Sequence, residues 1–215
     1  MKSLFGKELT LALHPTSLIF LGLSAMVLIP NYPYYVIFFY TGLGIFFICL
    51  SGRENQDITY SLMLPVAKRD LVSARFCLVI LIQCLQILIT IPFIGLRNIL
   101  VNTPNLAGMD ANFAMLGFSW VLLGLYNIVF FRVYYRNVQK VGTAFLWSSL
   151  VIMVFIGLAE ALEFAFPSIQ ATLDNTLAEL LGTRLLVFGI GFVLYGLLTF
   201  YSLKKARQHF AQQDL

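Results

Sequence analysis

Six long apolar runs, separated by short polar stretches, dominate the pattern of hydrophobic and polar positions along the chain. They cover Ser17–Pro30, Tyr32–Leu50, Phe76–Leu96, Phe113–Phe131, Gly142–Phe166 and Leu185–Leu203. A helix needs about 20 apolar residues to cross the roughly 30 Å of a bilayer core. The pattern therefore predicts an all-α integral membrane protein with six transmembrane helices, built as a single transmembrane domain over residues 1–215.

The composition excludes a water-soluble globule. Of the 215 residues, 60% are hydrophobic and only 11% are charged, whereas about a quarter of the residues of a soluble domain are charged. Six spans with short connections use most of this length, so we expect no ATPase domain in the chain. The three cysteines, Cys49, Cys77 and Cys84, lie within or at the ends of apolar runs, and we interpret them as buried apolar residues.

Basic residues are concentrated on one side of the predicted spans. Of the 14 Lys and Arg residues, all but Arg97 and Arg184 flank one face. Cytoplasmic loops carry an excess of such residues. We therefore expect a multi-pass protein of the bacterial cytoplasmic membrane with both termini in the cytoplasm, including a basic tail over residues 204–215.

Residues 1–14 are expected to form a short interfacial helix before the first span. Phe5, Leu9 and Leu13 recur at four-residue spacing, and His14-Pro15 ends the pattern. One alternative is that the segment is simply the beginning of the first span. A cleaved signal peptide is the weaker alternative, because His14-Pro15 separates the basic residues from the apolar run and no small-residue cleavage site follows it.

The predicted cytoplasmic loop, residues 51–75, is the most polar stretch before the tail. Glu54–Leu64 reads as a helix of about three turns that ends at Pro65, with Ile58 and Leu62 on one face. A plain loop of four residues would be enough to join two spans. This amphipathic segment therefore predicts a binding partner at the cytoplasmic face.

Residues 167–183 are expected to form an amphipathic helix on the outer side, since apolar residues recur there at helical spacing. A surface loop with one helical turn is the alternative. Just before this segment, Glu160 and Glu163 are three residues apart and share a helix face, so they are candidates for an outer vestibule. The alternative is that they simply face water and lipid headgroups.

Neutral polar residues form stripes on two predicted spans. Gln83, Gln86 and Thr90 share one face of the third span, and Ser119, Tyr126 and Asn127 lie close together on the fourth. Hydrogen bonds between packed helices are the favoured interpretation, each worth about 1 kcal/mol or less. The lining of a translocation path is the second.

The sequence lacks the patterns that would indicate catalysis. H-E-x-x-H and the P-loop pattern are absent, and both histidines lie outside the apolar runs. No ionisable residue lies near the middle of a run, as an ion-coupled carrier would need. We therefore expect no catalytic residues, no metal site and no cofactor bound by this chain, and a transport subunit powered by a separate protein.

The cytoplasmic loop resembles that of type-2 permeases of ATP-binding-cassette (ABC) exporters. Those proteins have an acidic helix, a Leu-Pro-Val turn and two basic residues leading into span three, matched here by Leu64-Pro65-Val66, Lys68 and Arg75. The resemblance implies that residues 54–62 form a coupling helix that docks on a nucleotide-binding subunit. The implied docking residues are Glu54, Asp57, Ile58, Ser61, Leu62 and Lys68.

In outline, the whole chain is similar to the type V exporter fold, and to small permeases such as phenol-soluble modulin and bacteriocin-immunity exporters. This resemblance implies an ABC ATPase subunit that holds ATP and Mg, a second permease copy or paralogue, and a surrounding lipid bilayer. It implies no nucleic-acid partner. The implied substrates are amphipathic peptides or hydrophobic compounds. The alternatives are a membrane assembly factor or sensor and, disfavoured by the lack of a polar span lining, an ATP-independent channel.

Overall fold

A computed structural model describes residues 2–63, 65–101, 103–174 and 180–212, and all regular elements in these ranges are helical. Their order is α1 Lys2–Lys7, η1 Glu8–Ala12, α2 Pro15–Gly22, η2 Leu23–Leu28, α3 Val36–Glu54, α4 Asp57–Leu62, α5 Lys68–Leu100, α6 Phe113–Tyr134, α7 Val141–Ala165, α8 Pro167–Ile169, η3 Gln170–Asp174 and α9 Leu181–Ala211. The prediction of an all-helical chain is confirmed for these residues.

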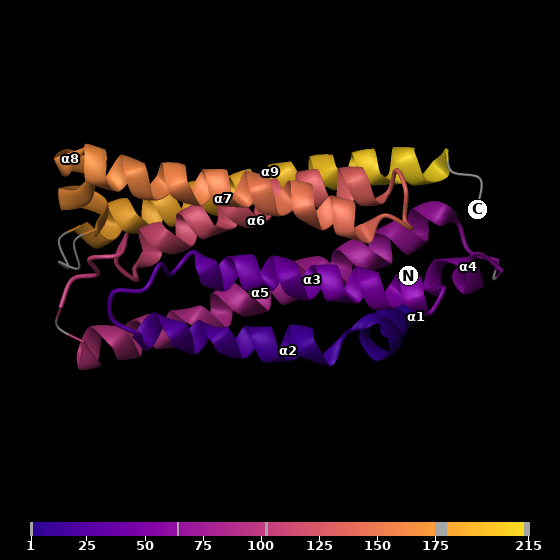
Figure 1. The fold of residues 1–215 in the computed structure, drawn as a ribbon, viewed down its shortest axis with the longest axis horizontal. Helices are drawn as coiled ribbons and strands as arrows, with labels where there is room; N and C mark the ends of the chain where they lie inside the picture. Colours follow the sequence, from indigo (N-terminus) through magenta and orange to yellow (C-terminus); the bar gives the residue numbers. More distant parts are fainter. Residues whose placement is uncertain (1, 64, 102, 175–179, 213–215) are drawn as a thin grey trace.

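The long helices lie side by side in an elongated bundle (Figure 1). We call its two ends the α4 end and the α8 end; α1 and the last turns of α9 both lie at the α4 end. Within the described ranges, five helices are long and apolar enough to cross a membrane: α3, α5, α6, α7 and α9. A sixth span results if the bent pair Leu4–Ala12 and Pro15–Leu28 is counted as one broken span.

The segment predicted to form the first span is bent where the sequence predicts a helix to end. Pro15 begins α2, and His14 before it is extended, with its Nδ1 accepting a hydrogen bond from the backbone N of Thr16 at 3.2 Å. The two segments meet at an angle of 78°. Because a 3₁₀-helix rises more per residue than an α-helix, the 3₁₀ turns of η2 lengthen this short span to about 24 Å.

The bundle has two layers, one formed by α2, α3 and α5 and the other by α6, α7 and α9 (Figure 1). Helix α6 is the most enclosed of the long helices. Of its 18-residue apolar stretch, 67% is buried inside the bundle, against 22% for the corresponding stretches of α7 and α9. The outward faces of α7 and α9 carry many exposed large apolar side chains, such as Leu158 and Leu197. Such faces are suited to contact with lipid or another subunit.

The structure corrects one expected helix and describes only part of another. Helix α3 runs on through Glu54, and Gln56 then adopts a left-handed conformation with φ of 52°, so α4 is a separate helix of only 6 residues. The expected single helix of three turns is wrong because this turn interrupts it. At the α8 end, the expected outer helix over residues 167–183 begins as α8 and η3, and its residues 175–179 lie outside the described residues.

The cysteines also differ from expectation in one case. Cys49 is buried and Cys84 is half-buried, but Cys77 is exposed on the side of α5. An apolar run does not show which of its faces points out of the bundle, and this face of α5 does.

Candidate functional site

A buried network of ion pairs lies at the α4 end. Arg75 of α5 donates through Nε to Glu8 of η1, and through Nη2 to Asp57 of α4 at 2.7 Å. On the other side of Asp57, Lys7 binds Oδ1 at 2.6 Å and Ser61 Oγ at 2.7 Å. Arg75 and Glu8 are 4% and 2% exposed. The network therefore joins the amino-terminal segment, α4 and α5.

This network fixes the orientation of α4. A six-residue helix has too few internal hydrogen bonds to be stable alone. Here Asp57 and Ser61, four residues apart, both point toward the bundle and hold one face of α4 against it. The opposite face of the same helix must therefore point outward.

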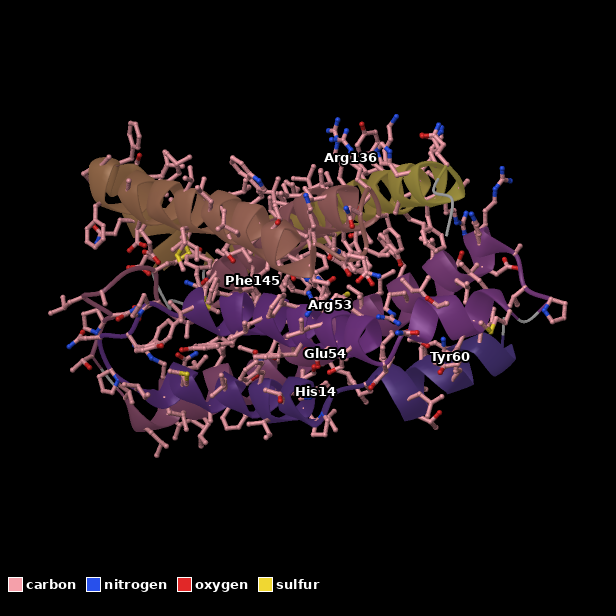
Figure 2. All side chains as sticks on the ribbon, turned by 45° about the vertical axis from the view of Figure 1, so that its right-hand side comes forward. His14, Arg53, Glu54, Tyr60, Arg136 and Phe145 are labelled. Carbon is pink, nitrogen blue, oxygen red and sulfur yellow. The ribbon has the colours of Figure 1, made fainter. Side chains whose placement is uncertain are left out.

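The outward face of α4 presents two large apolar side chains. Tyr60 is 64% exposed and Met63, which follows the helix, is 76% exposed. Glu54, the last residue of α3, is also exposed (Figure 2). In contrast, Ile58 and Leu62 are half-buried and pack on apolar clusters of the bundle itself. The two apolar residues singled out from the sequence thus face inward, and Tyr60 and Met63 face outward.

A groove of about 520 Å³ runs between α4 and the amino-terminal segment, lined partly by Leu11, Ala12 and Tyr60. Leu11 is 72% exposed. Lys68, the remaining expected docking residue, is the half-buried first residue of α5. The α4 end therefore combines a fixed short helix, exposed apolar side chains and a groove beside them.

Gln83 and Asn127 lie in the middle of the bundle and face each other. Their amides exchange hydrogen bonds of 2.9 and 3.0 Å, and both side chains are fully buried. Tyr195 donates to Gln83 Oε1 at 2.7 Å, and Asn127 donates to Thr199 Oγ1 at 3.0 Å. This group links α5, α6 and α9.

The other polar stripe residues are buried as well. Gln86 donates to Ser24 Oγ at 2.6 Å, and Ser24 bonds with Thr90 at 3.0 Å, which ties α5 to η2. Ser119 bonds to a carbonyl within α6, and Tyr126 donates to Gly42 O at 2.7 Å. A path along any of these residues would require these hydrogen bonds to break.

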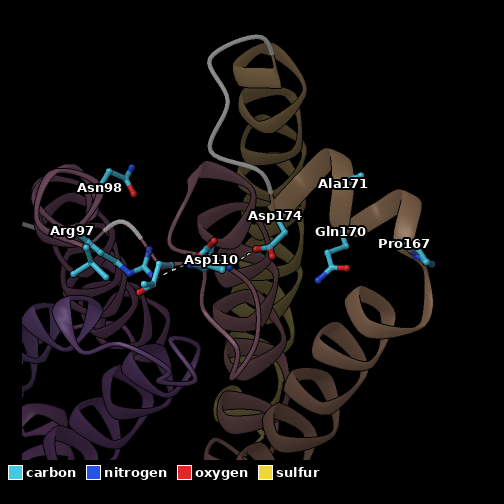
Figure 3. Close-up of a pocket in the computed structure, with 10 residues that line it drawn as sticks. Arg97, Asn98, Asp110, Pro167, Gln170, Ala171 and Asp174 are labelled. Carbon is cyan, nitrogen blue, oxygen red and sulfur yellow. Dashed lines mark hydrogen bonds and ion pairs between the residues drawn. The ribbon is translucent and has the colours of Figure 1, made fainter.

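A polar pocket of about 650 Å³ opens at the α8 end (Figure 3). On one wall Arg97 of α5 pairs with Asp110 at 3.0 Å and donates to Tyr34 Oη at 2.8 Å. On the other wall Asp174 of η3 accepts a hydrogen bond from the backbone N of Asp110. The segment between α5 and α6 thus bridges α5 and η3.

The two glutamates predicted for an outer vestibule do not line this pocket. Glu160 accepts a hydrogen bond from Met109 N at 3.1 Å, and Glu163 is 2% exposed. Glu160 supports the loop that carries Asp110, and simple exposure to water does not describe the buried Glu163. Among the described residues, no group of three or more His, Cys, Asp or Glu side chains could hold a metal ion.

The charge environment of this end affects Asp174. Burial raises the pKa of its carboxyl above the ordinary value, the hydrogen bond from Asp110 N opposes this, and the negative charge of Asp110 raises it further. A carboxyl group in such a position gains a proton more easily than one in water. The pocket wall therefore contains a group whose charge responds to pH.

The fold and these sites define a multi-pass helical membrane protein with a structured polar segment at one end of its spans. Within that class, the sequence model of the family described as ABC-2 family transporter protein matches residues 3–206, and the chain belongs to this family. Membership makes it a permease-type membrane component of an ABC transporter, which works with an ATPase subunit. No curated protein and no solved structure gives a significant match.

Sequence reasoning missed several residues that organise these sites. The role of Glu8 was not foreseen, although a single carboxylate in a largely apolar segment is a signal that a cationic partner lies nearby. Tyr60 and Met63 were overlooked because the apolar face with Ile58 and Leu62 was assigned to the partner, whereas it packs on the bundle. Arg97 and Asp110 are 13 positions apart and lie on different elements, and no local pattern pairs them.

Proposed function

We propose that this chain is the membrane subunit of an ATP-driven exporter, with the α4 end in the cytoplasm, where a separate ATPase subunit docks. The observation that carries the proposal is the outward face of α4, with Tyr60 and Met63. Buried ion pairs on the inward face of α4 hold this helix in place. Exposed apolar groups on a rigid element are favourable anchors at a protein interface.

The proposed docking surface consists of α4 and the end of α3, with Tyr60 and Met63 as anchors and the exposed Glu54 at the rim. Asp57 and Ser61 lie on the opposite face of α4 and hold the helix against the bundle through Lys7 and Arg75. Ile58, Leu62 and Lys68 support the segment from the bundle side. Movement of α4 on ATP binding would pass directly to α5 and η1 through the same ion pairs.

We further propose that two permease copies enclose the substrate path between them. The pockets described above lie at the ends of the bundle, and the polar residues of its interior already bind one another. The apolar character of the exposed span surfaces suits amphipathic peptides or hydrophobic compounds better than ions or sugars. The pocket at the α8 end, supported by Glu160 and Glu163, is the proposed outer vestibule.

The docking proposal is tested by Tyr60→Asp and Met63→Asp. Truncation of a buried anchor often costs about 2 kcal/mol, equivalent to roughly 30-fold in affinity, and a carboxylate there should cost at least as much. We expect both variants to lose co-purification with the ATPase subunit. Asn137→Asp, an exposed position in the α6–α7 connection at the same end, adds the same charge and should leave the complex intact.

Transport is measured with the same proteins in proteoliposomes. The wild-type complex should move a fluorescent amphipathic peptide when ATP is present and no ion gradient exists, and the two α4 variants should not. Transport driven by a proton gradient alone would contradict the proposal. Full assembly and ATPase stimulation by the α4 variants would also contradict it, and would favour the assembly-factor alternative.

A further inference from the structure

A second groove at the α4 end has a different chemical character from the docking surface. It has a volume of about 260 Å³ and lies between the start of α5 and the last turns of α9. Seven residues line it, among them Arg69, Phe200, Leu203, Lys204 and Arg207. Three of the seven are cationic and none is acidic, so the groove attracts anions.

The Arg207 guanidinium is held in position before any ligand arrives. Its Nε and Nη2 donate to Ser73 Oγ at 3.2 and 2.7 Å, and Ser73 in turn donates to the carbonyl of Arg69 at 2.5 Å. These contacts bring the Arg207 side chain of α9 to the first turns of α5, beside Arg69. A fixed guanidinium binds a phosphate with less loss of side-chain entropy than a free one.

On the same face of α9, apolar residues lie one helical turn before the basic residues, toward the middle of the helix. Phe200 precedes Lys204 by four residues, and Leu203 precedes Arg207 by four, so each pair occupies adjacent turns of one face. Phe200 is 70% exposed, and Val193 and Leu197 continue the exposed apolar surface toward the middle of the helix. The order from the helix end inward is therefore basic, then apolar.

This order matches the order of groups in a phospholipid, from phosphate to acyl chains. Because the chain is a multi-pass membrane protein, an apolar surface on a span contacts acyl chains, and the end of that span lies at headgroup depth. Basic pockets between transmembrane helices bind anionic headgroups. An acidic protein surface would satisfy the cations but would leave Phe200 without an apolar partner.

We propose that this groove is a binding site for one anionic phospholipid, whose phosphate lies among Arg69, Lys204 and Arg207 and whose acyl chains lie along Phe200. The proposal concerns a site separate from α4 and does not rest on the docking proposal. Bound lipid would join α9 to the first turns of α5, the part of α5 that also carries Arg75. Asp70 is the acidic residue nearest to the groove in sequence.

The test is fluorescence quenching in reconstituted vesicles. Phe200→Trp is made in full-length protein that also carries Trp120→Phe and Trp147→Phe, so the introduced indole is the single reporter. Quenching by dibrominated phosphatidylglycerol is compared with quenching by dibrominated phosphatidylcholine at one ionic strength. We expect phosphatidylglycerol to bind several-fold more tightly, and Lys204→Gln or Arg207→Gln to reduce this preference by about fivefold each at most.

Arg136→Gln is the matched control, because it removes one exposed charge at the same end outside the groove. Lys204 is exposed, so Lys204→Gln keeps the test valid even if Arg207→Gln disturbs folding. A preference that survives both groove substitutions, or that falls equally with Arg136→Gln, would overturn the proposal. Loss of the ATPase subunit without a change in lipid preference would also overturn it and identify a protein contact instead.

Discussion

Arg75 shows how strongly a single residue can constrain this protein. Its guanidinium is buried between η1, α3 and α4, and it has carboxylate partners on two of these elements. Gly52 of α3 faces it, and a Cβ atom there would lie 3.3 Å from Nη1, so a small residue is needed at this contact. Charges in such a place are stable only while they remain paired.

Neutralising Glu8 should therefore destabilise the fold. Glu8→Gln leaves the Arg75 charge with one carboxylate partner fewer, and removal of one member of a buried pair costs about 3–5 kcal/mol. We expect a fall in melting temperature of several degrees in detergent, measured by differential scanning fluorimetry. Glu54→Gln is the control, because Glu54 is exposed and its ion pair with Arg53, at 3.8 Å, is a surface pair of small energy. Equal melting temperatures for the two variants would contradict the role given to the network.

Asp174 should make the α8 end sensitive to pH. Its pKa is raised in the folded state, so the folded chain binds the proton more tightly than the unfolded chain does. The sign follows from linkage: its contribution to stability is fully present below the pKa of the unfolded state and is lost as the pH rises through the folded pKa.

Asp174→Asn removes this ionisation and keeps a side-chain oxygen to accept the hydrogen bond from Asp110 N. We expect the melting temperature of this variant, relative to wild type, to be about 2–4 °C higher at pH 8 if the relief is near 1 kcal/mol, and nearly unchanged at pH 4. Gln170→Ala, in the same segment and without a titratable group, should shift the melting temperature equally at both pH values. A pH-independent effect of Asp174→Asn would contradict the argument.

At the scale of elements, the contact between α6 and α9 depends on glycine. A Cβ atom at Gly117 would lie 2.7 Å from the backbone oxygen of Val187, and one at Gly191 would collide with the backbone of Gly117. Small residues at such a crossing let two helices approach closely in a membrane. The two helices thus bury backbone against backbone one turn before Tyr195, which donates a hydrogen bond to Gln83.

Gly191→Val should separate these helices and break the neighbouring hydrogen bonds. Overpacking of this kind costs about 1–3 kcal/mol or more, and here the obstacle is backbone, which cannot move aside like a flexible side chain. We expect loss of the monodisperse peak in fluorescence-detected size-exclusion chromatography, or a clear fall in melting temperature. Gly189→Val on the same helix has open space around its Cβ position and should be tolerated.

At the scale of the whole molecule, the bent first span decides the topology. Counting Leu4–Ala12 and Pro15–Leu28 as one span makes six crossings and places both ends of the chain on one side. A re-entrant segment would leave five crossings and would put the two ends on opposite sides. The position of α1 and the end of α9 at one end of the bundle favours six (Figure 1).

Cysteine labelling distinguishes these two topologies. In a background with Cys49, Cys77 and Cys84 replaced by Ser, we place single cysteines by Gly6→Cys, Gln170→Cys and Gln208→Cys, all at exposed positions. An impermeant maleimide added to intact cells should label only Gln170→Cys, and the other two should react only after permeabilisation. Labelling of Gly6→Cys from outside would establish five crossings and overturn the prediction of two cytoplasmic termini.

The sequence by itself determined the class of this protein, the position of its long apolar helices and the extent of α6 and α7. Each span is a local signal, because the bilayer requires about 20 consecutive apolar residues whatever the other helices do. The observed helices α6 and α7 begin or end within a few residues of the predicted runs Phe113–Phe131 and Gly142–Phe166. The resemblance carried by residues 51–75 pointed to the family whose model matches the chain.

Only the tertiary structure decided which polar groups meet and which face of α4 is available. Glu8 and Arg75 are 67 positions apart, and Gln83 and Tyr195 are 112 positions apart. Such pairs depend on the rotation and depth of each helix in the bundle, which many weak packing contacts set together and no local pattern encodes. For the same reason the sequence could not show that Ile58 and Leu62 face inward. The left-handed turn at Gln56 separates α4 from α3, and the ion pair between Arg75 and Asp57 sets which face of α4 lies against the bundle.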